Sequence, residues 1–138
     1  MNIELFRLLF DAGLFVLIWM VQLIVYPGFQ YYASEQLLTW HNTYTPRITV
    51  IVMPLMLGQL ALAALQLWTR QDWYTLSSAL IIALLWGSTF LYFIPLHGQI
   101  ANNQFNTQTL QELVSKNWGR TFLWTLLLAL SLLRKVNG

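Results

Sequence analysis

The sequence predicts an all-α protein, an integral membrane four-helix bundle that forms one domain over residues 1–138. Hydrophobic residues make up 57% of the chain and charged residues only 9%, whereas soluble domains average roughly 25% charged residues. Two stretches, 48–68 and 73–95, carry no charge, and each reaches the roughly 20 helical residues that cross a bilayer core. This composition argues against a soluble enzyme and excludes a disordered chain.

We expect four transmembrane helices, at about 4–26, 47–69, 73–95 and 114–135. The first is long enough only if it includes Arg7 and Asp11, whose i, i+4 spacing lets them pair across one helical turn. The fourth must include Lys116 and Arg120, because its apolar stretch alone is too short to span.

The connections between these helices differ in length. Residues 69–72 form a short hairpin between the second and third helices, whereas long loops at 27–46 and 96–113 lie together on the opposite side. Hydroxyl residues suited to N-capping predict short interfacial helices inside these loops, at about 34–44 and 107–113.

Basic residues predict the orientation, since cytoplasmic loops carry an excess of Lys and Arg. The side with both termini and the hairpin carries four, and the long-loop side carries three: Arg7, Arg70, Arg134 and Lys135 against Arg47, Lys116 and Arg120. We therefore expect a multi-pass protein of the bacterial inner membrane with both termini in the cytoplasm.

Uncharged polar and small residues inside the spans predict helix contacts. Interhelical hydrogen bonds explain three glutamines, Gln22, Gln59 and Gln66. Ala79, Ala83 and Gly87 repeat every four positions, a pattern typical of close helix packing. That face serves either the bundle itself or a homo-oligomer.

Polar and aromatic residues gather on the long-loop side of the spans. On the fourth helix, Asn117, Arg120 and Trp124 share one face. An arginine at the centre of a span costs about 2.5 to 3.5 kcal/mol, so we expect Arg120 to point into the bundle or a wet cavity. Snorkelling of this side chain to the lipid head groups is the alternative.

A second cluster precedes the second helix, with Pro46 suited to the first turn of that helix; it comprises Trp40, His41, Tyr44 and Arg47. Two arginines backed by aromatic residues suit an apolar molecule with an anionic or carbonyl head group. The predicted substrate-binding residues are therefore Arg47, Arg120, Tyr44, Asn117, Trp118 and Trp124.

His41 and His97, the two histidines of the chain, are the candidate catalytic residues, as proton carriers. Ligation of haem or a metal ion by this pair is the less favoured alternative, because the Glu-x-x-His spacing of di-iron bundles is absent. The chain has no cysteine, which excludes thiolate metal sites. We predict no metal, no cofactor and no nucleic-acid partner, since the basic residues form no patch.

Two segments resemble the anthrone-oxygenase-like superfamily of small four-helix membrane proteins: Ile-Pro-Leu-His-Gly-Gln-Ile at 94–100 and Leu-Val-Ser-Lys-Asn-Trp-Gly-Arg-Thr at 113–121. Trp118 and Arg120 match the family's Trp and Arg, whereas His97 stands where relatives often carry Asn, and the histidine that they often carry between Trp and Arg is absent. The resemblance implies the four-helix architecture and a cofactor-free reaction on an aromatic or polyketide-like substrate.

The predicted function is an amphipathic pocket near the long-loop side, which binds membrane lipid or a small hydrophobic ligand. If the protein is an enzyme, it is a cofactor-free oxidoreductase or isomerase, in which histidine moves a proton and arginine holds negative charge. The alternative is a non-catalytic accessory or assembly subunit that binds a partner through the Ala79/Ala83/Gly87 face.

Overall fold

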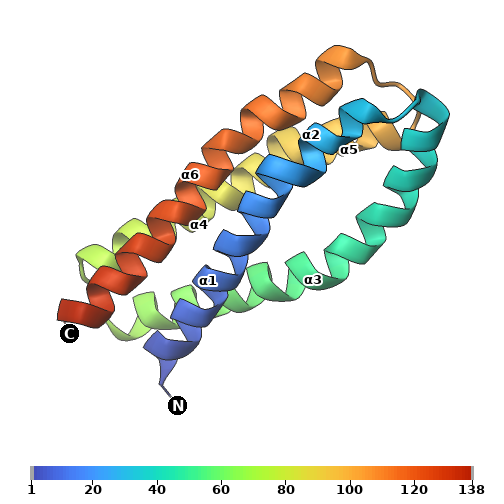
Figure 1. The fold of residues 1–138 in the computed structure, drawn as a ribbon. Coiled ribbons are helices and arrows are strands. Elements are labelled where there is room, and N and C mark those ends of the chain that lie inside the picture. Colours follow the sequence, from blue (N-terminus) through green and yellow to red (C-terminus); the bar gives the residue numbers. More distant parts are fainter. Residues whose placement is uncertain (1, 138) are drawn as a thin grey trace.

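The computed structural model describes residues 2–137, and within them the chain is helical and contains no strand. Its elements are α1 (Ile3–Met20), the π-helical turn η1 (Val21–Val25), α2 (Tyr26–Gly28), the 3-10 turn η2 (Phe29–Tyr31), α3 (Ser34–Thr69), α4 (Trp73–Ser88), the π-helical turn η3 (Thr89–Phe93), α5 (Ile94–Ala101) and α6 (Thr107–Asn137). Consecutive elements join end to end into four helical rods (Figure 1).

Three of these rods are long and apolar enough to cross a membrane: Ile3–Tyr31, Ser34–Thr69 and Trp73–Ala101. They confirm the predicted all-α class and the presence of transmembrane helices. The fourth rod, α6, is of similar length but more polar along its first half.

Two prolines at the predicted ends of helices lie inside continuous rods instead. Pro27 follows η1 and Pro95 follows η3. A proline ring lacks a donor and clashes with the carbonyl four residues earlier, and the wider π-helical turn before each proline relieves both problems. The predicted helix ends at 26 and 95 are therefore wrong, and the rods continue to Tyr31 and Ala101.

The predicted long loops are also mostly helical. Residues 34–44 are the first turns of α3, and residues 107–113 are the first turns of α6, so neither segment is a separate interfacial helix. Pro46 consequently lies inside α3 rather than at the start of a helix, and Pro54 is a second internal proline. Two internal prolines account for the bend of α3 along its length (Figure 1).

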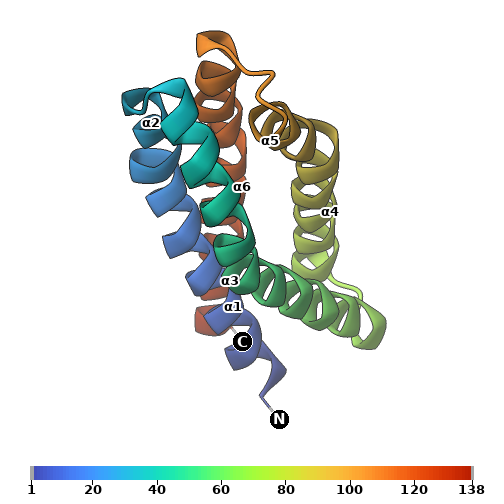
Figure 2. The same ribbon diagram turned by 90° about the vertical axis from the view of Figure 1, so that its right-hand side faces the viewer.

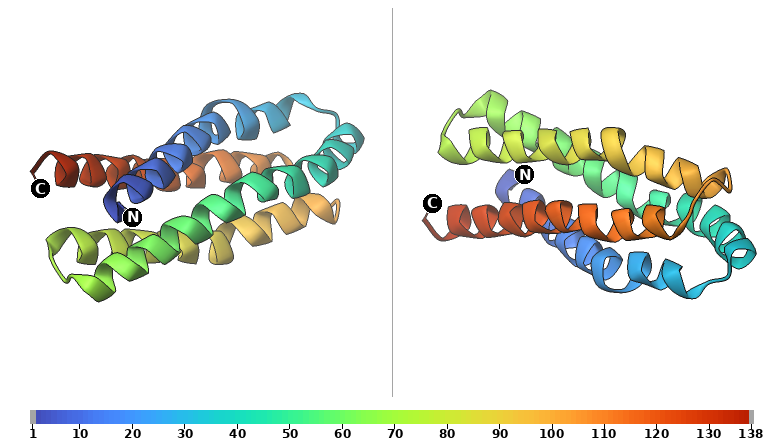
Figure 3. Two further views of the ribbon diagram at one scale, coloured as in Figure 1. Left: turned by 90° about the horizontal axis from the view of Figure 1, so that it is seen from below. Right: turned by 90° about the horizontal axis from the view of Figure 1, so that it is seen from above.

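The four rods form a closed arrangement in which α1 and α4 each pack against both α3 and α6. α3 starts beside α2 and crosses to α4 (Figure 2). Both termini and the connection 70–72 lie at one end of the bundle, which we name the terminal end (Figure 3). The connections 32–33 and 102–106 lie at the opposite end, which we name the distal end. The short connection between α3 and α4 therefore lies opposite the other two connections.

A buried ion pair lies at the centre of the terminal end. Arg7 Nε donates to both carboxylate oxygens of Asp11, at 3.0 and 3.1 Å, and neither side chain is exposed to solvent. Gln66 accepts from Arg7 Nη1 at 3.1 Å, and Gln59 donates to Asp11 at 2.6 Å. The predicted Arg7–Asp11 pair is confirmed, and it joins α1 to α3 through the two predicted glutamines.

The same carboxylate also connects α6 and α4. The Ser131 hydroxyl of α6 donates to Asp11. The Tyr74 hydroxyl of α4 lies 2.8 Å from the Ser131 oxygen and donates to it. One carboxylate thus links all four rods in the bundle interior. We name Arg7, Asp11, Gln59, Gln66, Ser131 and Tyr74 the ionic hub.

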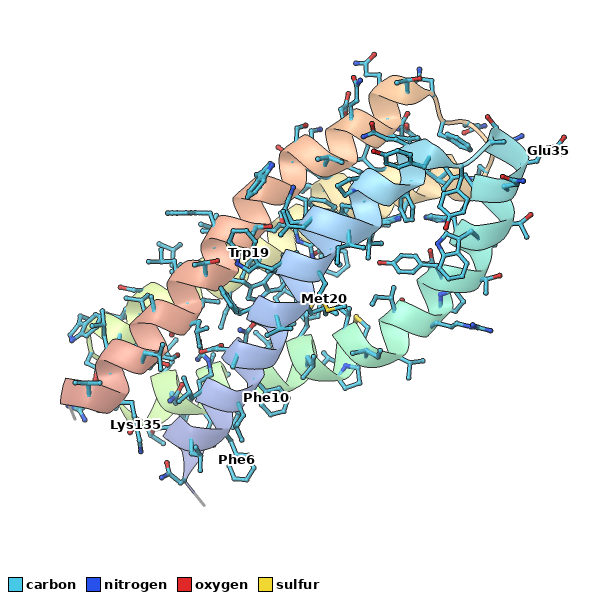
Figure 4. All side chains as sticks on the ribbon, viewed as in Figure 1. Phe6, Phe10, Trp19, Met20, Glu35 and Lys135 are labelled. Atoms are coloured by element: carbon cyan, nitrogen blue, oxygen red, sulfur yellow. The ribbon has the colours of Figure 1, made fainter. Side chains whose placement is uncertain are left out.

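The small-residue face of α4 does not pack inside the bundle. Ala83 is exposed, and a Cβ added to Gly87 would meet no atom within 4 Å. Close packing occurs instead between α1 and α3, where a Cβ added to Gly58 would overlap the ring of Phe10 (Figure 4). The expectation that the Ala79/Ala83/Gly87 face packs in its own bundle is wrong, and its use in a homo-oligomer stays a prediction.

Removing one charge from the ionic hub should be far more damaging than removing both. Asp11→Ala leaves Arg7 buried without its partner and should lower the free energy of unfolding by about 3 to 5 kcal/mol. The double variant Arg7→Met/Asp11→Leu strands no charge and should lose less. Unfolding in mixed detergent micelles measures both, and equal losses for the single and double variants would contradict a charge-paired hub.

Asp72 caps the start of α4 at the terminal end. Its Oδ1 accepts from the backbone N–H groups of Tyr74 and Thr75, both at 3.1 Å, and Arg134 Nη1 lies 3.1 Å from Oδ2. The Thr75 N–H above all, helped by Arg134 and Arg70, holds the pKa of the Asp72 carboxyl below its ordinary value of 3.8. Its stabilisation is therefore complete above that value and is lost as pH falls through the folded-state pKa.

We expect Asp72→Asn to weaken the acid dependence of stability, because an amide oxygen still caps the helix but does not titrate. Asp72→Ala should lose about 0.5 to 2 kcal/mol at neutral pH, since it removes the cap as well. Unfolding free energies measured from neutral to acidic pH test this. If Asp72→Asn loses as much unfolding free energy at acidic pH as the wild type does, other carboxylates cause that loss.

Candidate functional site

A cavity of about 390 Å³ lies in the distal half of the bundle, where all four rods contribute to its wall. Residues of two hydrophobic clusters contribute to its wall, one cluster toward the terminal end and one at the distal end. Most of its lining is apolar and includes Leu14, Ile18, Val21, Val52, Met56 and Phe93. Val21 belongs to η1 and Phe93 to η3, and such π-helical turns occur frequently at functional sites.

The polar groups of the cavity wall come from all four rods. Tyr26, Tyr44, His97 and Arg120 all line the cavity. Tyr26 follows η1 directly, and His97 lies four residues after η3. The result is an amphipathic cavity, with an apolar body and a cluster of hydrogen-bonding groups.

Arg120 is almost completely buried, with 8% of its surface exposed. Its guanidinium carbon lies 4.2 Å from the centre of the Phe93 ring and 5.0 Å from that of Trp124. It pairs with no carboxylate among residues 2–137, and its Nε has no hydrogen-bond partner there. The cation therefore rests on aromatic faces and borders the cavity without a counter-ion from the described chain.

His41 and His97 are 56 residues apart in sequence and are in direct contact in the structure. His97 Nδ1 lies 2.8 Å from His41 Nε2, and His97 Nε2 lies 3.0 Å from the Tyr26 hydroxyl. His41 lies behind His97, is 1% exposed, and leaves its Nδ1 without a hydrogen-bond partner. Tyr26, His97 and His41 thus form one hydrogen-bonded chain, here called the relay chain.

The relay chain does not suit the haem or metal alternative. Two ring nitrogens that face each other at 2.8 Å share a proton, so they leave no space for an ion between them. No group of three or more His, Asp or Glu side chains able to hold a metal ion occurs within residues 2–137.

The predicted site residues separate into those at the cavity and those elsewhere. Tyr44, Trp124, Arg120 and His97 line the cavity, and His41 joins them through His97. Asn117 is fully buried but donates to Gln22 at 2.9 Å, so it connects α6 to α1 instead.

Arg47 and Trp118 do not belong to the cavity, contrary to our expectation. The cavity face of α3 includes Tyr44, Thr45 and Ile48, and with about 100° between successive residues position 47 points away from it. Arg47 is accordingly exposed. Trp118 is 48% exposed and packs edge-on against Trp19. The predicted site with two arginines is therefore wrong, and Arg120 is the one that borders the cavity.

Tyr26 is the functional candidate that the sequence-based list of site residues omitted. It lies four residues after Gln22 and directly before Pro27. Polar groups one turn apart in an otherwise apolar helix were a usable signal. Nothing in the local sequence marks Phe93 as a surface for a buried guanidinium.

Histidine nitrogen NMR tests the relay chain directly, because the chain has two histidines. Selective ¹⁵N-histidine labelling should reveal a scalar coupling across the hydrogen bond between one nitrogen of each ring. Tyr26→Phe should shift the other nitrogen of His97 and keep the coupling. Four uncoupled nitrogens in the folded protein would contradict the contact.

Comparisons with protein-family models, with curated proteins and with solved structures find no match to this chain. The resemblance to the anthrone-oxygenase-like superfamily therefore stays a prediction that rests on two short segments.

Proposed function

We propose that the chain is a multi-pass four-helix membrane protein whose cavity binds a small apolar or lipid-like molecule with an anionic or carbonyl head group. Arg120 is the observation that carries this proposal. A buried guanidinium without a counter-ion is costly, and a bound carboxylate, phosphate or enolate would offset that cost through charge-assisted hydrogen bonds.

The shape and size of the cavity support the same ligand class. Its volume of about 390 Å³ falls among the roughly 300 to 1,000 Å³ typical of small-molecule sites. Thr49 and Ile94 line the cavity and are exposed, and both lie in helices apolar enough to span a membrane. This arrangement favours a ligand that arrives from the hydrocarbon layer rather than from water.

The proposal includes α6 as the fourth span. The helix contains 31 residues and packs beside α1 and α4. Two of its charged side chains need not face lipid, since Arg120 faces the cavity and Arg134 pairs with Asp72 at the terminal end. We further propose a cytoplasmic terminal end, on the four-to-three excess of basic residues.

A brominated fatty acid tests the ligand site, because bromine quenches the fluorescence of a nearby indole and Trp124 lines the cavity. In lipid nanodiscs, brominated decanoate should quench wild-type protein at lower concentration than brominated decanol. The saturable part of the quenching should disappear in Trp124→Phe. Arg120→Gln should weaken decanoate binding by about tenfold or more, as expected for a lost hydrogen bond to a charged group.

Two controls give this experiment its specificity. Arg47→Gln removes an exposed arginine of the same protein and should leave both affinities unchanged. Decanol binding should also survive Arg120→Gln, because the apolar wall is intact. Quenching that does not saturate, or decanoate affinity that is the same in wild type and Arg120→Gln, would refute the proposed head-group site.

A further inference from the structure

We infer that Tyr26, His97 and His41 form a proton relay that opens into the cavity, and that the substrate is an apolar molecule with an acidic C–H or O–H group beside a carbonyl. This inference rests on the proposed function and names its chemistry. It follows from the order of the three groups relative to the cavity.

The relay chain has one end in the cavity and the other end behind its wall. Tyr26 and His97 line the cavity, whereas His41 does not. The two links between them, 3.0 and 2.8 Å, are both within proton-transfer distance. His41 Nδ1 ends the chain as a buried polar atom with no partner in the described protein. Such an atom requires an explanation in a native structure, and the end of a relay supplies one.

Two proton arrangements fit the same heavy atoms when both rings are neutral. In the first, the Tyr26 hydroxyl donates to His97 Nε2, and His97 Nδ1–H donates to His41 Nε2. In the second, both bonds are reversed, so that the Tyr26 hydroxyl is free to donate into the cavity. The first arrangement accepts a proton from the cavity and the second delivers one.

Proton abstraction through the first arrangement balances without a cofactor. The substrate proton moves to the Tyr26 oxygen while the Tyr26 proton moves to His97 Nε2, and the His97 Nδ1 proton moves to His41 Nε2. The products are a substrate enolate or phenolate and a doubly protonated His41. When the three proton transfers run in reverse, a proton returns to the substrate. If it returns to a different atom of the substrate, the net reaction is an isomerisation.

Arg120 explains why a relay is better here than a single base. The enolate gains the guanidinium of the cavity wall as its counter-ion. A positive charge kept on His97 would share that wall with Arg120, whereas transfer to His41 places the charge outside the cavity. The relay chain therefore places the new imidazolium on His41, away from Arg120. The Arg120 guanidinium can then act as the counter-ion of the enolate.

Benzoylacetone is a suitable probe, since it joins an apolar phenyl group to an acidic C–H between two carbonyls. In nanodiscs in D₂O, wild-type protein should accelerate exchange of that hydrogen, followed by NMR, above the rate with empty nanodiscs. His41→Gln should reduce this acceleration by about 100-fold or more, although His41 does not line the cavity. Arg47→Gln is the control, because Arg47 is exposed outside the cavity and its replacement should retain the acceleration.

Chemical rescue separates a relay from a structural role. Added imidazole should restore part of the exchange rate in His41→Ala, and a packing defect would not respond in this way. Full exchange in His41→Gln would overturn the relay, because the proton would then stop at His97.

Displacement of brominated decanoate by benzoylacetone distinguishes the two proposals. Displacement with exchange no faster than in empty nanodiscs overturns the relay and leaves the binding site standing. Decanoate binding without displacement overturns the assigned substrate class. Absence of decanoate binding overturns the proposed function and the relay together.

Discussion

The Arg7–Asp11 pair is the constraint on which the rest of the bundle depends. Groups that cannot reach water inside a membrane must be satisfied within the protein, and here one carboxylate gathers donors that connect all four rods. The pair thereby fixes which face of α1 points inward. Farther along that face lie Leu14 and Ile18 in the core and Tyr26 at the relay chain.

The two buried arginines differ in the groups that surround their guanidinium groups. Arg7 has a carboxylate and an amide oxygen as partners, whereas Arg120 has aromatic faces and a cavity. Gln59 lies between these two regions, since it donates to Asp11 and accepts from the Trp124 indole at 3.5 Å. The hub thus supports the wall of the cavity without neutralising the group that faces it.

Proline placement couples the fold to the site. Each of two rods contains a π-helical turn that ends two residues before a proline, and each turn precedes one member of the relay chain, Tyr26 in one case and His97 in the other. A wider turn rotates the residues that follow it relative to a regular helix. The Tyr26 hydroxyl and the His97 imidazole, which follow the two turns, lie 3.0 Å apart near the distal end of the bundle.

Features that depend on local spacing were predictable from the sequence alone. Long uncharged runs predicted the membrane class, and an i, i+4 interval predicted the Arg7–Asp11 pair, because both follow from helix geometry alone. The remaining features depend on tertiary packing. The helices continue through Pro27 and Pro95, and Arg47 is exposed. His41 and His97, 56 residues apart in sequence, are in hydrogen-bond contact. Such contacts depend on how each rod is rotated against its neighbours, and that rotation is set by packing of the whole bundle rather than by any one segment.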